Sequence, residues 1–298
     1  MQALEFTLSL HRSLEDRSGR LDATMAGPEW WTDPLTLHDA RVATRRLRAV
    51  LDLLDPEVYP RLKAAGRALR DFTALMGPRR ELDVTRELLE GLHGEAAFDL
   101  QRASAEHLME ALDRRRLKAS RRLAADLEKV DPADWKRLLA VESLPSPFHA
   151  PPAAETAWQG LRDPLESALE ALRGHAKGED VEALHGARVK LKRARYRLEI
   201  LGELFPAPPA AGLARLKALQ EALGRHHDMA LLEAFLWEQQ AGLAAAGFRV
   251  LASSLLELVG MAAEARHRAF GELATALQGV QPSAWLKELR QELAGGPA

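Results

Sequence analysis

Two segments of this chain are related copies, DPLTLHDARVATRRLRAVLDLL at residues 33–54 and DVEALHGARVKLKRARYRLEIL at residues 180–201. They lie 147 residues apart and align without a gap, and ten of the 22 aligned residues are identical. The same offset pairs three further positions, Arg70 with Lys217, Gly77 with Gly224 and Glu81 with Asp228. Because this period is far longer than that of a solenoid repeat, it predicts a duplicated unit and two related half-domains.

Proline marks the boundary between the two copies. The stretch SLPSPFHAPPA at residues 143–153 contains four prolines among eleven residues, so it cannot be helical throughout. We therefore predict a first half-domain at residues 1–145, a Pro-rich linker at 146–153 and a second half-domain at 154–298. The alternative is an ordinary loop between the helices of a single globule.

The composition favours an all-α chain. Leu and Ala supply 105 of the 298 residues, whereas Val, Ile and Thr number only 11, one and nine. Because β-branched residues favour strands, and Leu and Ala favour helices, a substantial sheet is excluded. We predict N-caps at Asp33 and Asp180. The predicted helices form antiparallel bundles and span residues 2–17, 34–55, 57–76, 80–92, 96–130, 154–173, 181–204, 210–223, 226–246, 248–278 and 283–294.

Several protein classes are excluded or not expected. The chain has no cysteine, which rules out disulfides and thiolate metal sites or nucleophiles. Residues 1–17 have no basic region followed by an apolar run, so we expect no secretory signal there. No uncharged apolar run reaches the ~18–20 residues of a membrane span. We therefore expect a cytoplasmic protein that has no membrane partner.

Each repeated segment has a single basic stripe between apolar flanks when it is drawn as a helix at about 100° per residue. No acidic residue occurs from Arg41 to Leu51 or from Arg188 to Leu198. Like charges three and four residues apart repel each other, so a stripe that occurs twice indicates an anionic ligand rather than a solvated face. The stripes contain His38, Arg41, Arg45 and Arg48 in the first copy and His185, Arg188, Lys192, Arg195 and Tyr196 in the second.

The stripes suit a ligand that presents phosphates and no bases. Arg makes bidentate contacts with phosphate, and His adds a donor when a nearby anion raises its pKa. Aromatic residues make up only 5% of the chain, so stacking platforms for a single strand are scarce. The stripes also lack the Asn and Gln side chains that read base edges. A basic-helix binder of nucleic acid, or of another phosphorylated ligand, remains an alternative.

Further basic residues follow the first stripe. The next predicted helix carries Arg61, Lys63, Arg67 and Arg70, and Arg79 and Arg80 follow Gly77. A denser run lies on the long helix at 96–130. Because the charges of that run surround the helix, an ordinary solvated surface explains them equally well, and we leave them out of the predicted site: Arg114, Arg115, Arg116, Lys118, Arg121 and Arg122.

The segments LHDARVATRRLR at 37–48 and LHGARVKLKRARY at 184–196 resemble the paired motif of the CHAD domains, the conserved histidine α-helical domains. Each half of that family shows a His, an Arg three residues later, a basic pair and a further Arg. The family's short turn after the next helix is resembled by MGPRRELDV at 76–84 and LGRHHDMAL at 223–231. The resemblance covers nearly the whole chain. It implies two four-helix bundles related by a pseudo-twofold axis, with basic residues lining a central groove or pore.

The resemblance also implies the ligand, because CHAD domains bind inorganic polyphosphate, often at polyphosphate granules. Two residues depart from the family's pattern, Glu81 where Asp is frequent and His227 where Asn is common. By the resemblance, the ligand contacts are His38, Arg41, Arg45, Arg46, Arg48, His185, Arg188, Lys192, Arg193 and Arg195. To these the predicted site adds, by alignment or helical position, Lys63, Arg70, Arg80, Tyr196, Lys217 and His227.

A metal-dependent phosphohydrolase is the less favoured alternative. His38-Asp39 resembles the His-Asp pair of such enzymes, but Gly186 stands at the equivalent of Asp39, so the pair is not repeated. An Arg stripe is also an unfavourable place for a divalent cation. We expect a non-catalytic binding protein without a cofactor, and the sequence does not predict its oligomeric state. Glu81 and Asp228 fit either first-turn acids of the following helix or braces for stripe arginines.

Overall fold

The structure is a computed structural model that describes residues 3–54, 59–140, 153–175, 180–204 and 208–294. Within these ranges every regular element is a helix and no strand forms, which confirms the predicted all-α class. No described helix is long and apolar enough to cross a membrane. The helices are α1 (Ala3–Thr24), α2 (Pro34–Leu51), α3 (Pro60–Leu75), α4 (Gly77–Glu95), α5 (Asp99–Leu127), α6 (Ala133–Leu139), α7 (Ala153–His175), α8 (Val181–Leu204), α9 (Ala210–Ala245), α10 (Arg249–Ala276) and α11 (Pro282–Leu293).

Helix α9 corrects one predicted boundary. The sequence predicts a break between residues 223 and 226, but α9 runs unbroken through this region. The equivalent region of the first copy does break, because α4 begins at Gly77 with Pro78 in its first turn. Proline has no N–H to donate and clashes with the preceding turn, whereas Gly224 keeps its N–H and costs only about 1 kcal/mol in a helix. A glycine without a proline therefore does not end the helix here.

Helix α6 is not among the predicted helices. It has only seven residues, too few for a clear apolar period. Its Trp135 is nevertheless buried and lies with its ring centroid 5.0 Å from that of Phe72 on α3. The predicted linker at 146–153 lies outside the described residues, except for Ala153 at the start of α7.

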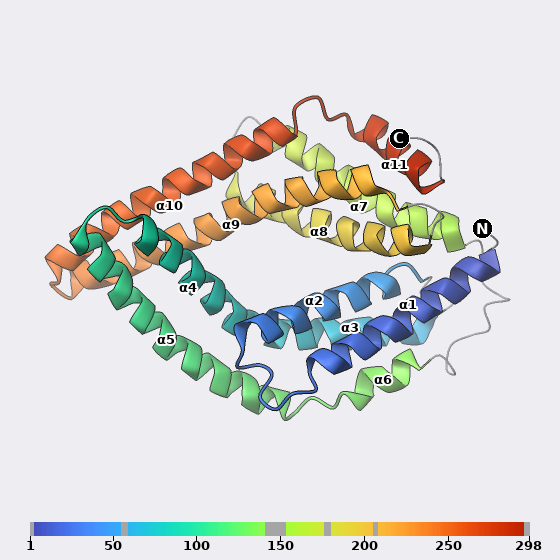
Figure 1. The fold of residues 1–298 in the computed structure, drawn as a ribbon, viewed down its shortest axis with the longest axis horizontal. Coiled ribbons are helices and arrows are strands. Elements are labelled where there is room, and N and C mark those ends of the chain that lie inside the picture. The colour runs from blue at the N-terminus through green and yellow to red at the C-terminus, as the bar shows by residue number, and fades with distance from the viewer. Residues whose placement is uncertain (1–2, 55–58, 141–152, 176–179, 205–207, 295–298) are drawn as a thin grey trace.

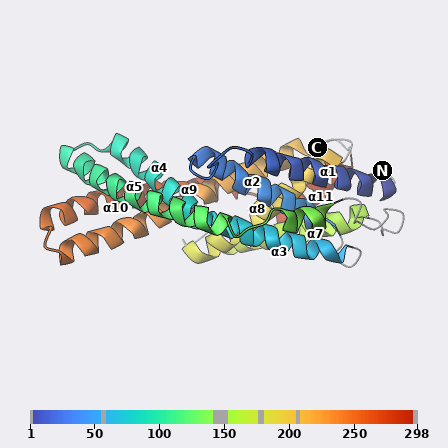
Figure 2. The ribbon, with the colours of Figure 1, turned by 90° about the horizontal axis from the view of Figure 1, so that it is seen from below.

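Two groups of buried apolar side chains hold the helices together. The larger group joins α1, α2, α3, α6, α7, α8, α11 and the first half of α9, which we name the body, and it also includes Leu123 near the end of α5 and Leu273 near the end of α10. The second group joins α4 and α5 to α10 and the second half of α9, and we name these four segments the arm, which extends to the left in Figures 1 and 2. The arm takes helices from both predicted halves, so the two halves share this interior, which includes Leu89, Leu108, Leu232, Leu236 and Leu255.

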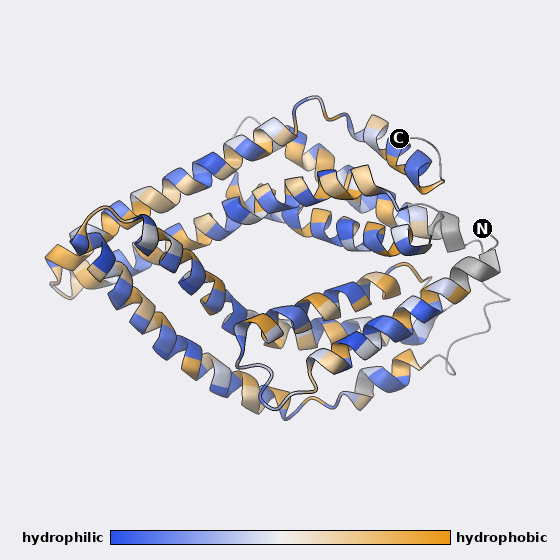
Figure 3. Cartoon of the chain, viewed as in Figure 1, coloured by the Kyte–Doolittle hydropathy of each residue, from blue (hydrophilic) through white to orange (hydrophobic). Residues whose placement is uncertain are grey.

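Helices α2 and α8 contact each other at the centre of the body. Helix α2 is flanked by α1 and α3, and α8 is flanked by α7 and α9. Figure 3 shows that hydrophilic and hydrophobic residues alternate along these helices, as amphipathic helices require. The apolar faces of α2 and α8 are buried, so the basic side chains of the stripes do not contribute to the apolar core. The buried residues include Leu37, Ala40 and Leu47 on α2 and Leu184, Ala187 and Leu191 on α8.

Candidate functional site

The two stripe helices begin in the same way. On α2 the Asp33 carboxylate accepts a hydrogen bond from the Thr36 backbone N–H at 2.8 Å. On α8 the Asp180 carboxylate accepts one from the Ala183 N–H at 3.0 Å. Each bond satisfies a backbone donor that the first turn of a helix leaves unpaired. The predicted N-caps are therefore observed, and they fix the start of both stripes at equivalent positions.

Ion pairs join α2 and α8 reciprocally. Arg193 Nε on α8 lies 2.9 Å from Asp52 Oδ2 at the end of α2. Arg46 Nε on α2 lies 3.4 Å from Glu199 Oε2 on α8. The offset of 147 residues turns Arg46 into Arg193 and Asp52 into Glu199, so the two pairs are one contact made twice in opposite directions. Such an exchange of partners is what the predicted pseudo-twofold relation between the two halves would produce.

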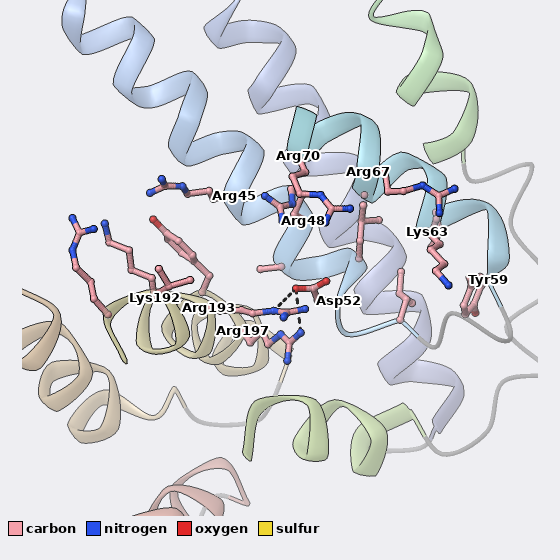
Figure 4. A pocket seen from close by; sticks show the side chains of 18 of the residues that line it. Arg45, Arg48, Asp52, Tyr59, Lys63, Arg67, Arg70, Lys192, Arg193 and Arg197 are labelled. Carbon is pink, nitrogen blue, oxygen red and sulfur yellow. Dashed lines mark hydrogen bonds and ion pairs between the residues drawn. The ribbon is translucent and has the colours of Figure 1, made fainter. Parts of the chain in front are cut away.

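A pocket of about 760 Å³ lies beside this contact, between α2 and α3 on one side and α8 on the other (Figure 4). Asp52 is the single carboxylate among the described residues that line it. The two sides supply nine Lys and Arg side chains, and His185 adds an imidazole. The nine cations are Arg45, Arg48, Lys63, Arg67 and Arg70 from α2 and α3, and Arg188, Lys192, Arg193 and Arg197 from α8.

Three of the nine cations are held by carboxylates. Asp52 pairs with both Arg193 and Arg197, at 2.9 and 3.1 Å from its Oδ2 atom, as Figure 4 shows. Arg197 also donates to the Gly160 carbonyl, and Arg188 Nη2 lies 3.5 Å from Asp228 Oδ1. The other six have no ion pair within the ranges that the structure describes. These six, the unpaired pocket cations, are Arg45, Arg48, Lys63, Arg67, Arg70 and Lys192.

Burial and mutual repulsion disfavour the charged forms of several of these groups. Burial, and then the nearby Arg188 and Arg45, lower the pKa of Lys192 to about 7. Burial likewise lowers the pKa of Arg48 and of Arg188, although Asp52 and Asp228 oppose the shift. The protein therefore concentrates positive charge at an electrostatic cost, which an anion in the pocket removes.

His38 and His185, the histidines of the two repeated segments, lie at the edge of this region. Their neighbours, Arg80 and His227, are equivalent under the 147-residue offset. The Nδ1 atoms of His185 and His227 lie 3.2 Å apart, so at most one of them carries a proton in this contact. Burial, followed by Arg188 and His185, lowers the pKa of His227 to about 4. In the first copy, burial and then Arg80, the counterpart of His227, lower the pKa of His38. His38 and His227 are thus neutral donors or acceptors at neutral pH.

Asp228 acts as a brace for a stripe arginine. It lies inside the continuous helix α9, so its interpretation as a first-turn acid is wrong. Its carboxylate pairs with Arg188 instead. The first copy repeats this relationship more weakly. Burial and then the nearby Arg45 lower the pKa of Arg41 to about 10, and Glu81, the counterpart of Asp228, opposes this shift.

A family model for the CHAD domain matches residues 19–237. The chain belongs to the CHAD domain family. The crystal structure of the CHAD domain from the plant Ricinus communis is 24% identical, with a TM-score of 0.65, and the match covers 94% of this chain and 92% of that one. PptA from Streptomyces chartreusis is 20% identical, with a TM-score of 0.53, and the match covers 91% of this chain and 98% of PptA. At these identities the two structures show a shared fold. No curated protein matches this chain.

In this CHAD domain the pocket brings together more than half of the predicted site residues. They come from both repeated helices and from α3, three segments that are far apart in the sequence. Tyr196 is the single predicted residue among them without a basic side chain, and the Arg195 guanidinium lies 5.1 Å from its ring centroid. The predicted residues that line the pocket are Arg45, Arg48, Lys63, Arg70, His185, Arg188, Lys192, Arg193 and Tyr196.

The other predicted residues do not line this pocket. Arg46 and Arg195 both pair with Glu199, at 3.4 and 3.5 Å. Arg41 donates to the Thr73 carbonyl at 2.8 Å and so ties α2 to α3. Lys217 is exposed on α9, with its Nζ atom 3.8 Å from Glu221. The remaining three, His38, Arg80 and His227, belong to the edge described above.

Three charged lining residues are absent from the predicted site, namely Asp52, Arg67 and Arg197. Arg67 lies four residues after Lys63 and three before Arg70, so helical spacing alone would have placed it on their face. Arg197 lies four residues after Arg193 and gives the same signal. Its first-copy counterpart is Val50, which explains why the repeat does not point to it. Asp52 is acidic, so the basic pattern of the repeated segments gives no signal for it.

Proposed function

We propose that this CHAD domain binds inorganic polyphosphate in the pocket between α2, α3 and α8 and does not change it chemically. The observation that carries the proposal is the set of six unpaired pocket cations that share the pocket with a single carboxylate, which is already engaged by two arginines. Unpaired cations that crowd together are unfavourable on their own, and a chain of phosphates compensates several of them at once.

The lining favours phosphate over nucleic acid. Seven of the nine pocket cations are Arg, whose planar guanidinium makes bidentate bonds to phosphate. The aromatic residues of the lining, Tyr59 and Tyr196, are 3% and 6% exposed, so neither offers a free ring for a base to stack on. The described lining contains no Asn or Gln that could read a base edge. A ligand composed of phosphates alone needs neither a stacking ring nor a side chain that reads bases, so it matches the polar groups of this lining.

The absence of catalysis is part of the proposal. Within the described ranges, no group of three or more His, Asp or Glu side chains is arranged to hold a metal ion. The acidic residues nearest the basic region, Asp52 and Asp228, are engaged by arginines and are poorly placed to act as bases. A location in the cytoplasm at polyphosphate granules, as the family resemblance implies, completes the proposal.

The experiment compares long-chain polyphosphate with heparin, single-stranded DNA and RNA at equal total charge. We expect polyphosphate to bind more tightly than the other three. If six phosphates contact cations, the logarithm of affinity falls with the logarithm of salt concentration with a slope of about −4 to −5. A nearly flat salt dependence would show that the cations do not contact the phosphates. Affinities for heparin and DNA equal to that for polyphosphate would show that the region is a generic basic surface.

A further inference from the structure

Helix α5 carries a dense basic run outside the pocket. Six of the nine residues from Arg114 to Arg122 are Lys or Arg, and none is acidic. One of the six, Arg116, turns toward the arm interior, where its Nε donates to Asp83 at 2.9 Å. The other five are exposed to solvent. We name them the α5 basic face: Arg114, Arg115, Lys118, Arg121 and Arg122.

The α5 basic face is a single stripe. At about 100° per residue its five side chains lie within an arc of about 120°, and Arg116 lies outside that arc. The sequence predicts that the charges of this run surround the helix, and the inward position of Arg116 corrects this prediction. The stripe extends for about 12 Å along the helix axis, from Arg114 to Arg122.

The nearby carboxylates neutralise this face only in part, through long contacts at its two ends. Asp113 accepts hydrogen bonds from Arg86 and Arg116. Asp126 lies 2.9 Å from Lys129 but 3.9 Å from Arg122, and Glu110 lies 3.9 Å from Arg114. The remaining cations have no ion pair in the described part of the chain, namely Arg115, Lys118 and Arg121.

The second copy lacks this face. Residues 147 positions later read MAAEARHRA at 261–269, where two arginines replace the six basic residues of α5 and both have carboxylate partners: Arg266 pairs with Glu233 at 2.9 Å, and Arg268 lies 4.0 Å from Glu264. The packing of the duplicated fold therefore does not require a basic stripe at this place. Like charges three and four residues apart on α5 destabilise the helix, so a stripe in which three of five cations have no ion pair in the described part of the chain points to a ligand.

We propose that the α5 basic face is a second binding surface for a phosphate chain, distinct from the pocket; its ligand is inferred from the proposed function. No α5 residue lines the pocket, but α5 contacts α3, which contributes Lys63, Arg67 and Arg70 to it. The aromatic ring of Phe235 lies beside the face, but the Arg115 guanidinium covers it at 5.8 Å from the ring centroid, so the face favours a chain without bases over nucleic acid. One long polymer that engages both surfaces gains affinity without a new contact at either.

The test uses matched charge changes. The α5 variant carries Arg114→Gln, Lys118→Gln, Arg121→Gln and Arg122→Gln, and it retains Arg115, whose guanidinium lies 5.8 Å from the Phe235 ring centroid. The control variant neutralises four scattered exposed cations and has the same net charge, with Arg12→Gln, Arg173→Gln, Arg249→Gln and Lys287→Gln. The pocket variant carries Arg45→Glu and Lys192→Glu. Circular dichroism verifies that each variant keeps its helical content.

Long-chain polyphosphate is titrated into each protein at several salt concentrations. We expect the α5 variant to lose affinity about tenfold or more at low salt and its salt slope to shrink by about two to three, while the control changes little. We also expect the α5 changes to abolish the binding that remains in the pocket variant. Equal polyphosphate affinities for the α5 and control variants overturn the inference. So does a parallel titration with single-stranded DNA in which the α5 variant loses affinity for the DNA alone. Failure of the wild-type protein to bind polyphosphate overturns the proposed function instead.

Discussion

Arg193 on α8 and Asp52 at the end of α2 lie 2.9 Å apart, and the 147-residue offset converts this pair into Glu199 and Arg46, which lie 3.4 Å apart. The two copies of the repeat therefore meet through equivalent residues that exchange roles. The basic pocket lies beside this contact, so each copy supplies part of one shared lining. Both repeated segments thus contribute basic side chains to the candidate site.

The two reciprocal pairs are predicted to differ in their contribution to stability. Asp52 holds Arg193 and also Arg197, whose side chain is 6% exposed, so Asp52→Asn leaves a buried guanidinium without its anion. We expect Asp52→Asn to lower the free energy of unfolding by about 1–3 kcal/mol. Urea denaturation measures this loss.

Glu199→Gln is the matched control for that experiment. Its partner Arg46 is 45% exposed, and both of its ion pairs are long, at 3.4 and 3.5 Å. Solvent screens such pairs, so we expect a loss below about 1 kcal/mol. Equal losses for the two variants would contradict the different weights assigned to the two contacts.

Polyphosphate binding is predicted to strengthen as the pH falls from 8 to 6. The pKa of Lys192 is lowered to about 7, so this side chain is mostly neutral at pH 8 and mostly charged at pH 6. A bound phosphate stabilises the charged form, so binding near pH 7 takes up a proton. Calorimetry in buffers with different ionisation enthalpies measures this uptake, and titrations at both pH values measure the affinity.

Two lysine-to-arginine variants isolate the contribution of Lys192. Lys192→Arg keeps the charge at both pH values, so we expect it to bind about as well at pH 8 as at pH 6. Lys63→Arg changes an exposed lysine of the same pocket and is expected to retain the wild-type pH dependence. Titration of the ligand's own end groups is common to all three proteins and cancels. An unchanged pH dependence in Lys192→Arg would place the titrating group elsewhere.

Polyphosphate incubated with the protein and Mg²⁺ or Mn²⁺ is predicted to keep its length. The described residues provide no metal-binding cluster, and the carboxylates beside the pocket are paired with arginines. Gel electrophoresis of the polymer and an assay for free phosphate measure the outcome. Release of phosphate above a heat-inactivated control, abolished by His38→Ala, would revive the phosphohydrolase alternative.

The parts of the molecule that depend on local sequence are predictable. Helix propensity gives the all-α class, and the capping positions Asp33 and Asp180 are both observed. The continuous helix α9 is missed, because a glycine without a proline is too weak a signal to decide a boundary. The repeat predicts that the two stripes are equivalent. The reciprocal ion pairs join residues that the same offset relates, but neither Arg46 nor Arg193 belongs to a stripe, so the equivalence of the stripes stays a prediction.

The directions of the arginine side chains depend on which helices are neighbours, so they cannot be predicted from local sequence. Arg46 and Arg195 belong to basic segments, yet Glu199 engages both outside the pocket lining. Arg197 enters the lining because the end of α2 places Asp52 against it. The single basic face of α5 becomes visible once Asp83 on α4 is seen to hold Arg116 inward. In each case a carboxylate from another helix, or from later in the same helix, decides where the arginine points.

The central claim is that one phosphate chain is bound by both copies in a shared pocket. Arg45 and Lys192 are equivalent under the repeat, both line the pocket, and neither has an ion pair within the described ranges. The most direct measurement is the affinity of long-chain polyphosphate for Arg45→Glu and for Lys192→Glu at pH 6, with Arg173→Glu, an exposed site outside the pocket lining, as control. The account predicts losses of about tenfold or more that are similar for the two pocket variants, and a much smaller loss for the control. Wild-type affinity in either pocket variant would contradict it.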